Sequence, residues 1–86
     1  MITVSVVADH ELVRTGICRM LEDQDGIQVI GQAESGEEAI NIVRQQHPNV
    51  VLLDVNMPGI GGVETTRRLL HTAPETKVLA VSGLAE

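Results

Sequence analysis

Hydrophobic and polar positions change their spacing along the chain, and each change predicts a new element. Residues 3–8 are rich in β-branched side chains and end at a polar Asp-His pair, which is typical of a strand that runs into a loop. From Glu11 onward the apolar positions recur at helical spacing on one face, until Asp25-Gly26 ends the helix. These apolar positions are Val13, Ile17, Met20 and Leu21.

The next segment repeats the order of strand and helix. Residues 27–33 form a second, weaker strand pattern. Ser35 and Glu38 have the spacing of a capping box, which predicts a helix that begins here and ends before Pro48. We expect this helix to turn Ala39, Ile40 and Val43 inward.

Residues 49–54 end in four aliphatic side chains and an aspartate, Asp54. Four consecutive aliphatics indicate a strand buried on both faces, as in the centre of a parallel sheet. The chain then turns at residues 57–59 and enters a third helix that ends before Pro74, with Val63, Arg67 and Leu70 on one face. Residues 77–81 form a fourth strand, closed by Ser82-Gly83.

Alternating strands and helices at this spacing predict an α/β fold of βαβ units around a parallel sheet. The 86 residues contain no internal repeat or linker, and they suffice for one small domain.

Charge and composition exclude several classes of function. Twelve acidic and six basic residues give a net charge of −6, which argues against binding of nucleic acid or of an anionic membrane by this segment. The absence of aromatic residues argues against single-strand binding by base stacking. A single cysteine, Cys18, no secretory signal and no apolar run of membrane-spanning length predict a soluble, cytoplasmic protein.

Polar side chains stand at three of the predicted strand ends: Asp9, Asp54 and Ser82. Ligands of open parallel sheets bind beyond the carboxyl ends of the strands. If these strands are neighbours, two carboxylates and a hydroxyl converge there, and such oxygen ligands suit Mg²⁺ together with phosphate oxygens.

Three sequence segments resemble the receiver domain of bacterial response regulators. They are VSVVADHELVRTGICRML, VVLLDVNMPGIGG and AVSG, and the resemblance extends over all 86 residues. Within that family the sequence is most similar to the GacA and UvrY type of two-component regulator, of the LuxR/NarL-like class, in which a helix-turn-helix DNA-binding domain follows the receiver. The resemblance implies a flavodoxin-like (CheY-like), doubly wound sheet with strand order 2-1-3-4.

The same resemblance implies the roles of the residues at the strand ends. Asp54 would be the phosphoacceptor, taking a phosphoryl group from a sensor histidine kinase. Asp9 and Asp54 would bind Mg²⁺, with the backbone carbonyl of Asn56 as a further ligand, and Ser82 would be the switch hydroxyl. The chain would then be a signalling module and not an enzyme, reaching DNA only through an output domain that these residues do not include.

The sequence departs from the family in two ways. Ala8 stands where the family has the first of two adjacent acidic residues. The family's last helix, strand and helix would follow Ser82, with a phosphoryl-contacting lysine, so we expect a partial receiver; Lys77 lies at the wrong end of its strand to replace that lysine. An edge strand at residues 77–81, aliphatic on both faces, predicts self-association through this strand.

Two other functions stay open. The first is a degenerate receiver that binds a partner without being phosphorylated, as Ala8 and the missing elements suggest. The second is a haloacid-dehalogenase-like aspartyl phosphatase, although Asn56 stands where such enzymes need a second acidic residue.

Several residues also have purely structural interpretations. Asp9 could serve as the N-cap of the first helix. His10, His47 and His71 are interpreted as structural, as is Cys18, a small apolar residue on the first helix. The glycines at 59, 61 and 62 indicate turn chemistry, because a P-loop would need a lysine and a different spacing.

Overall fold

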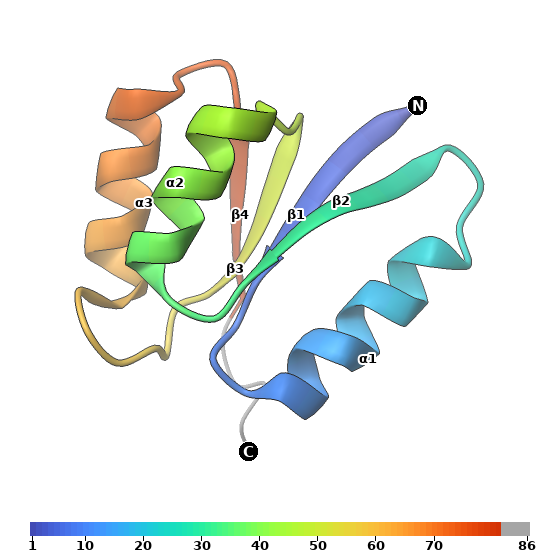
Figure 1. Cartoon of the computed structure of the whole chain (residues 1–86), viewed down its shortest axis with the longest axis horizontal. Helices are drawn as coiled ribbons and strands as arrows, with labels where there is room; N and C mark the ends of the chain where they lie inside the picture. The colour runs from blue at the N-terminus through green and yellow to red at the C-terminus, as the bar shows by residue number, and fades with distance from the viewer. Residues whose placement is uncertain (82–86) are drawn as a thin grey trace.

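The computed structural model describes residues 1–81, in which strands and helices alternate strictly (Figure 1). The elements are β1 (Ile2–Val7), α1 (Glu11–Glu22), β2 (Ile27–Ala33), α2 (Gly36–Gln46), β3 (Val50–Asp54), α3 (Gly61–Thr72) and β4 (Lys77–Val81). The predicted strands agree with these bounds to within one residue. No helix in this part of the chain is long and apolar enough to cross a membrane.

All strand pairs in the sheet are parallel, and the strand order is β2-β1-β3-β4. This order and the α/β, flavodoxin-like architecture confirm the fold class expected from the sequence. β3 lies between β1 and β4, as its run of four aliphatic residues predicts. Within residues 1–81, β4 pairs with β3 alone and so forms an edge of the sheet.

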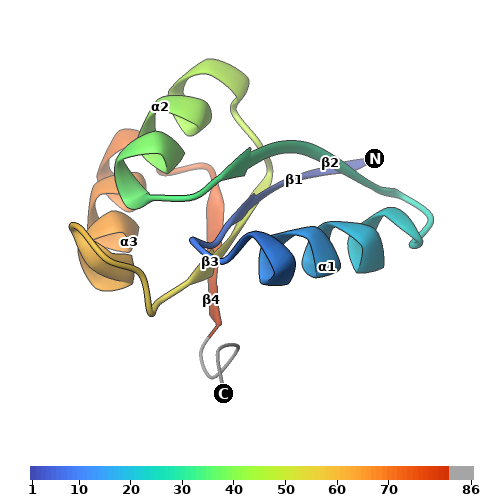
Figure 2. The ribbon, with the colours of Figure 1, turned by 60° about the horizontal axis from the view of Figure 1, so that its bottom comes forward.

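Helices cover both faces of the sheet: α1 lies on one face, and α2 and α3 lie side by side on the other (Figure 2). The core between the sheet and the α2–α3 pair contains Val7, Ala33, Ala39, Val43, Val51, Leu53, Met57 and Leu69. The core on the α1 face contains Val4, Val6 and Cys18, flanked by Ile17, Leu21, Ile27, Val29, Val50 and Leu52. The fold is therefore doubly wound, and its two hydrophobic cores contain no aromatic side chain.

Ser35 caps α2 as predicted, and the reciprocal bond of the capping box goes to the residue before the cap. The Oγ of Ser35 accepts a hydrogen bond from the Glu38 N–H at 3.2 Å, and the Glu38 carboxylate accepts one from the Glu34 N–H at 3.2 Å. The helix ends at Gln46. The next residue, His47, caps it with a left-handed backbone (φ 49°) and donates its N–H to the carbonyl of Val43.

The prediction for the buried face of α1 was wrong at Met20, which is 70% exposed. The buried face is centred on Ile17, Cys18 and Leu21. At about 100° per residue, Met20 lies outside this arc, and the smaller Cys18 takes the buried position.

The face of α3 that carries Val63, Arg67 and Leu70 points to solvent, whereas Thr65 and Leu69 are fully buried.

Two glycines allow α3 to pack closely against its neighbours. A Cβ at Gly62 would overlap the backbone of Val55, and a Cβ at Gly36 would overlap the Thr65 hydroxyl. Small residues therefore set the distance from α3 to the end of β3 and to α2.

Candidate functional site

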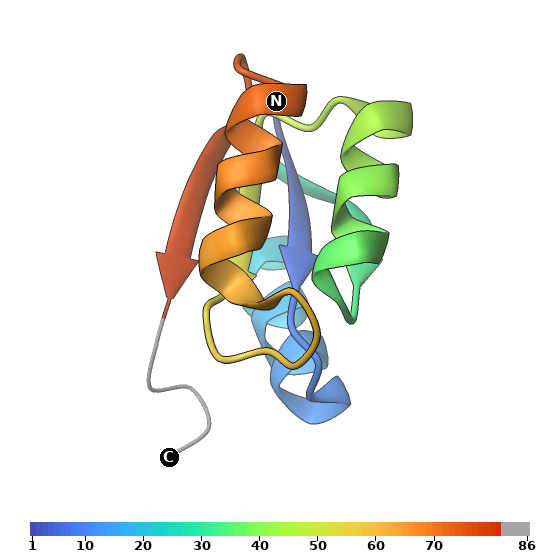
Figure 3. The ribbon, with the colours of Figure 1, turned by 90° about the vertical axis from the view of Figure 1, so that its left-hand side faces the viewer.

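The strand register brings the predicted site residues to one edge of the sheet. Val7 pairs with Leu53, and Asp54 pairs with Val81, so the strands β1, β3 and β4 end at the same level. The loops that follow β1 and β3 both lie at this carboxyl edge (Figure 3). Asp9, just after β1, and Asp54, at the end of β3, are the acidic residues that lie at this edge.

Asp54 ends the central strand and is only 3% exposed. Its Oδ1 accepts a hydrogen bond from the Asn56 N–H at 2.9 Å, which fixes the orientation of the carboxylate. Among residues 1–81, its Oδ2 receives no such bond. The carboxylate is thus oriented through one of its oxygens.

The loop after Asp54 is held in place at several points. The Val55 N–H donates to the Val81 carbonyl at 3.0 Å, and the side chain of Met57 is buried in the core. Gly59 and Gly61 have positive φ angles of 78° and 77°, a backbone conformation that other residues adopt at a cost. The glycines serve turn geometry, which agrees with the structural interpretation.

Asp9 follows β1, and its Oδ1 is buried without a hydrogen-bond partner in the described part of the chain. The prediction that Asp9 caps α1 was wrong: the N-cap residue is His10, and no side chain caps this helix. A buried carboxylate oxygen without a donor is unfavourable, and a bound cation would relieve the cost.

Arg14 is a residue of this region to which the sequence analysis assigned no role. Its Nη1 donates to the carbonyl of Ala8 at 2.7 Å and so ties the first turn of α1 to the end of β1. The sequence signal was present, because Arg14 lies within the segment VSVVADHELVRTGICRML that carries the resemblance to receiver domains.

Ala8 is fully buried, and it adds no carboxylate to this edge. Within residues 1–81, no group of three or more His, Cys, Asp or Glu side chains is placed to hold a metal ion. The residue types still fit Mg²⁺: the carboxylates of Asp9 and Asp54 each have an oxygen without a hydrogen bond within residues 1–81, the carbonyl of Asn56 would add a third oxygen, and Mg²⁺ keeps several waters. The predicted switch residue, Ser82, lies outside the described residues.

The other candidate residues lie where their structural interpretations place them. His47 and His71 stand at the carboxyl ends of α2 and α3. Cys18 is buried, and this burial, together with the nearby Glu22, raises the pKa of its thiol. Lys77 begins β4 and is therefore at the end of that strand away from Asp54.

Comparison with known proteins shows to which family the chain belongs. The family model of the response regulator receiver domain matches residues 4–86. The chain belongs to this family.

Two relatives and one solved structure show which members of the receiver family are similar. Response regulator GacA of Pseudomonas viridiflava is 62% identical over 86 residues, which are all of this chain and 40% of that protein. Response regulator UvrY of Escherichia coli (strain K12) is 48% identical over 82 residues, 95% of this chain and 38% of that protein. The signal receiver domain of the putative response regulator NarL from Mycobacterium tuberculosis has a TM-score of 0.88 and 33% identity, covering 94% of this chain and 65% of that one.

The resemblance to the GacA and UvrY type is thereby confirmed. The chain spans about two fifths of the length of these curated relatives.

Proposed function

We propose that this chain is part of a phosphorylation-controlled receiver in which Asp54 accepts a phosphoryl group from a sensor histidine kinase. The observation that carries the proposal is the state of the Asp54 carboxylate. It is buried at the end of the central strand, is oriented by the Asn56 N–H through Oδ1, and has Oδ2 free of hydrogen bonds within residues 1–81. A positioned carboxylate of this kind is a usable nucleophile for phosphoryl transfer.

In the proposed step, Oδ2 of Asp54 attacks the phosphorus of a phosphohistidine on the kinase. The new P–O bond makes an aspartyl phosphate, and the P–N bond breaks, returning its electron pair to the histidine nitrogen. Asp9, Asp54 and the carbonyl of Asn56 would hold Mg²⁺, which when bound neutralises charge on the phosphoryl oxygens. The aspartyl phosphate carries up to about two negative charges in place of the one on the free carboxylate, and the hydroxyl of Ser82 is our candidate to donate a hydrogen bond to its oxygens.

We also propose that phosphorylation controls DNA binding by an output domain outside these 86 residues, as in transcription regulators of the GacA and UvrY type. The acidic charge of the chain, −6, supports a signalling role over direct contact with DNA.

The test is phosphorylation by acetyl phosphate and Mg²⁺, followed by intact mass measurement. We expect one added phosphoryl group on the parent chain, none on Asp54→Asn, and one on the control Asp25→Asn, which removes an exposed carboxylate from the α1–β2 turn. A phosphoryl group that persists in Asp54→Asn would refute the assignment.

A phosphorylation-independent binding module is the second candidate, and buried Ala8 favours it because the metal site lacks a carboxylate there. In that case the folded parent chain stays unmodified while Ala8→Asp gains the phosphoryl group. An aspartyl phosphatase, in contrast, would hydrolyse a generic phosphate ester over many turnovers. We expect none, because Asn56 contributes a backbone N–H to Asp54 and has no carboxylate to act as an acid.

A further inference from the structure

A hollow of about 190 Å³ lies between α2 and α3, and its lining is strongly cationic. Ile40 and Arg44 line it from α2, and Arg67, Arg68, His71 and Thr72 line it from α3. Three of the six basic residues in a chain of net charge −6 therefore gather around one hollow. None of these residues belongs to the Asp9 and Asp54 site.

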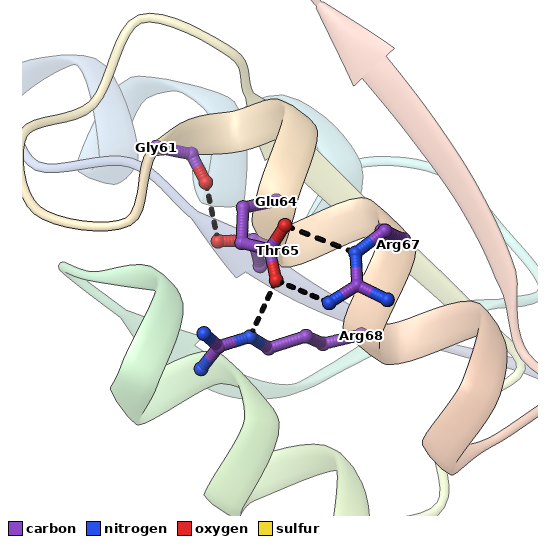
Figure 4. A network of polar contacts seen from close by, with 5 residues as sticks. All are labelled: Gly61, Glu64, Thr65, Arg67 and Arg68. Carbon is purple, nitrogen blue, oxygen red and sulfur yellow. Dashed lines mark hydrogen bonds and ion pairs between the residues drawn. The ribbon is translucent and has the colours of Figure 1, made fainter.

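One carboxylate, that of Glu64, is already bound by this cluster (Figure 4). It accepts hydrogen bonds from Arg67 Nε at 3.0 Å, from Arg67 Nη2 at 2.6 Å and from Arg68 Nε at 2.7 Å. The bonds from Arg67, and then those from Arg68, lower the pKa of Glu64 to about 2. Glu64 is thus ionised at neutral pH, and its two carboxylate oxygens pair with Nε and Nη2 of Arg67.

The remaining donors have no partner within residues 1–81. Arg68 uses only its Nε, and Arg44 makes no hydrogen bond or ion pair there. Arg68 remains about half exposed, so a ligand can reach its terminal nitrogens from solvent. Two arginines with unused donors, from two different helices, therefore line one hollow together with His71.

We propose that this hollow binds a phosphate group, either free or carried on a small ester. A carboxylate is planar and pairs with one guanidinium through two parallel hydrogen bonds, as Glu64 does with Arg67. A phosphate group is tetrahedral and accepts hydrogen bonds from several directions. Arg44 lines the hollow from α2, and Arg68 and His71 line it from α3, and donors available from two sides suit the tetrahedral anion.

The experiment is a titration of the ¹⁵N-labelled 86-residue chain with inorganic phosphate, at constant ionic strength set by chloride and without Mg²⁺. We expect saturable shifts of the arginine Nε–H signals of Arg44 and Arg68 and of the backbone amides at the end of α3. Glycerol phosphate should reproduce these shifts if an ester is accepted, and acetate should give none that saturate. Absence of saturable shifts with phosphate, or equal binding of acetate, would overturn the proposal.

Variants separate the site from general charge effects. Arg44→Gln and Arg68→Gln should each weaken phosphate binding roughly tenfold, the effect of one charge-assisted hydrogen bond. The control Arg19→Gln removes the same charge from an exposed position on α1 and should leave the affinity unchanged. Glu64→Gln should tighten binding several-fold, because it releases Arg67 and Arg68 and removes a like charge. Equal weakening by the α1 control, or weaker binding by Glu64→Gln, would contradict the assignment.

Discussion

Ala8→Asp adds a carboxylate to the proposed metal site. Residue 8 follows Val7, which pairs with Leu53, so position 8 is level with Asp54 on the adjacent strand, about 4.8 Å away. The position is fully buried, and the side chain cannot turn away to bulk solvent without moving the backbone. The substitution therefore places two carboxylates side by side and close to Asp9.

The expected cost without metal follows from the charge separation. Two unit charges roughly 5–6 Å apart in an effective dielectric of about 20 repel by about 3 kcal/mol. We expect Ala8→Asp to lower the free energy of unfolding by about this amount in EDTA. A cation that binds the folded state restores stability, by about 2.7 kcal/mol at a concentration one hundred times the Kd.

The measurement is urea unfolding followed by far-UV circular dichroism, because the chain has no aromatic residue to report by fluorescence. Parent, Ala8→Asp and the neutral control Ala8→Asn are compared at one protein concentration, in EDTA and in Mg²⁺. Only Ala8→Asp should recover most of its lost stability in Mg²⁺, with a lower Kd than the parent. Equal dependence on Mg²⁺ in Ala8→Asp and Ala8→Asn would refute the reasoning.

Two further predictions concern surfaces away from that site. The carboxyl signal of Glu64 should titrate near pH 2. Its ion pairs therefore stabilise the fold above the ordinary pKa of 4.5, and this stabilisation is lost as the pH falls towards 2. Arg67→Gln should raise the titration midpoint of Glu64, and an unchanged midpoint would mean that the ion pair does not form in solution. We also propose that the 86-residue chain self-associates through β4, where Leu79 is 56% exposed on an edge strand. Leu79→Lys should reduce the sedimentation-derived mass whereas Leu70→Lys, at a residue of similar exposure on α3, should not; a monomeric parent at micromolar concentration would disprove it.

The sequence pattern predicted the order and bounds of the elements because each boundary carries a local signal. Ser35 and Glu38 form the capping box, and Pro48 follows the end of α2. The aliphatic run before Asp54 identified the central strand, which in turn placed Asp54 at the carboxyl edge. These features depend on residues close together in the sequence.

The pattern was least informative where tertiary contacts decide the outcome. Met20 and Cys18 are both acceptable on an apolar face, and only the position of the sheet determines which is buried. The hydrogen bond from Arg14 to the Ala8 carbonyl depends on the path of the loop between β1 and α1, which the spacing of apolar residues does not specify. The cationic hollow depends on the packing of α2 on α3, which brings Arg44 close to arginines more than twenty residues later.

Gly62 connects the packing of α3 to the geometry of Asp54. Its N–H donates to the Val55 carbonyl at 3.3 Å, and a Cβ at this position would overlap the Val55 backbone. Val55 lies between Asp54 and Asn56, whose N–H orients the Asp54 carboxylate. Gly62→Ala should therefore push α3 away from the end of β3 and misalign the Asp54 carboxylate. Overpacking costs about 1–3 kcal/mol, more than the roughly 1 kcal/mol that alanine gains over glycine in a helix.

The matched control is Gly16→Ala on α1, where nothing lies within 4 Å of the added Cβ. This variant should be more stable than the parent by up to about 1 kcal/mol, since only helix propensity changes. We expect Gly62→Ala to be less stable in urea and slower to react with acetyl phosphate at Mg²⁺ saturation, where Gly16→Ala keeps the parent rate. If Gly62→Ala instead matched the control in both measurements, the strand end would tolerate a shift of α3, and the orientation of Asp54 would rest on the Asn56 hydrogen bond alone.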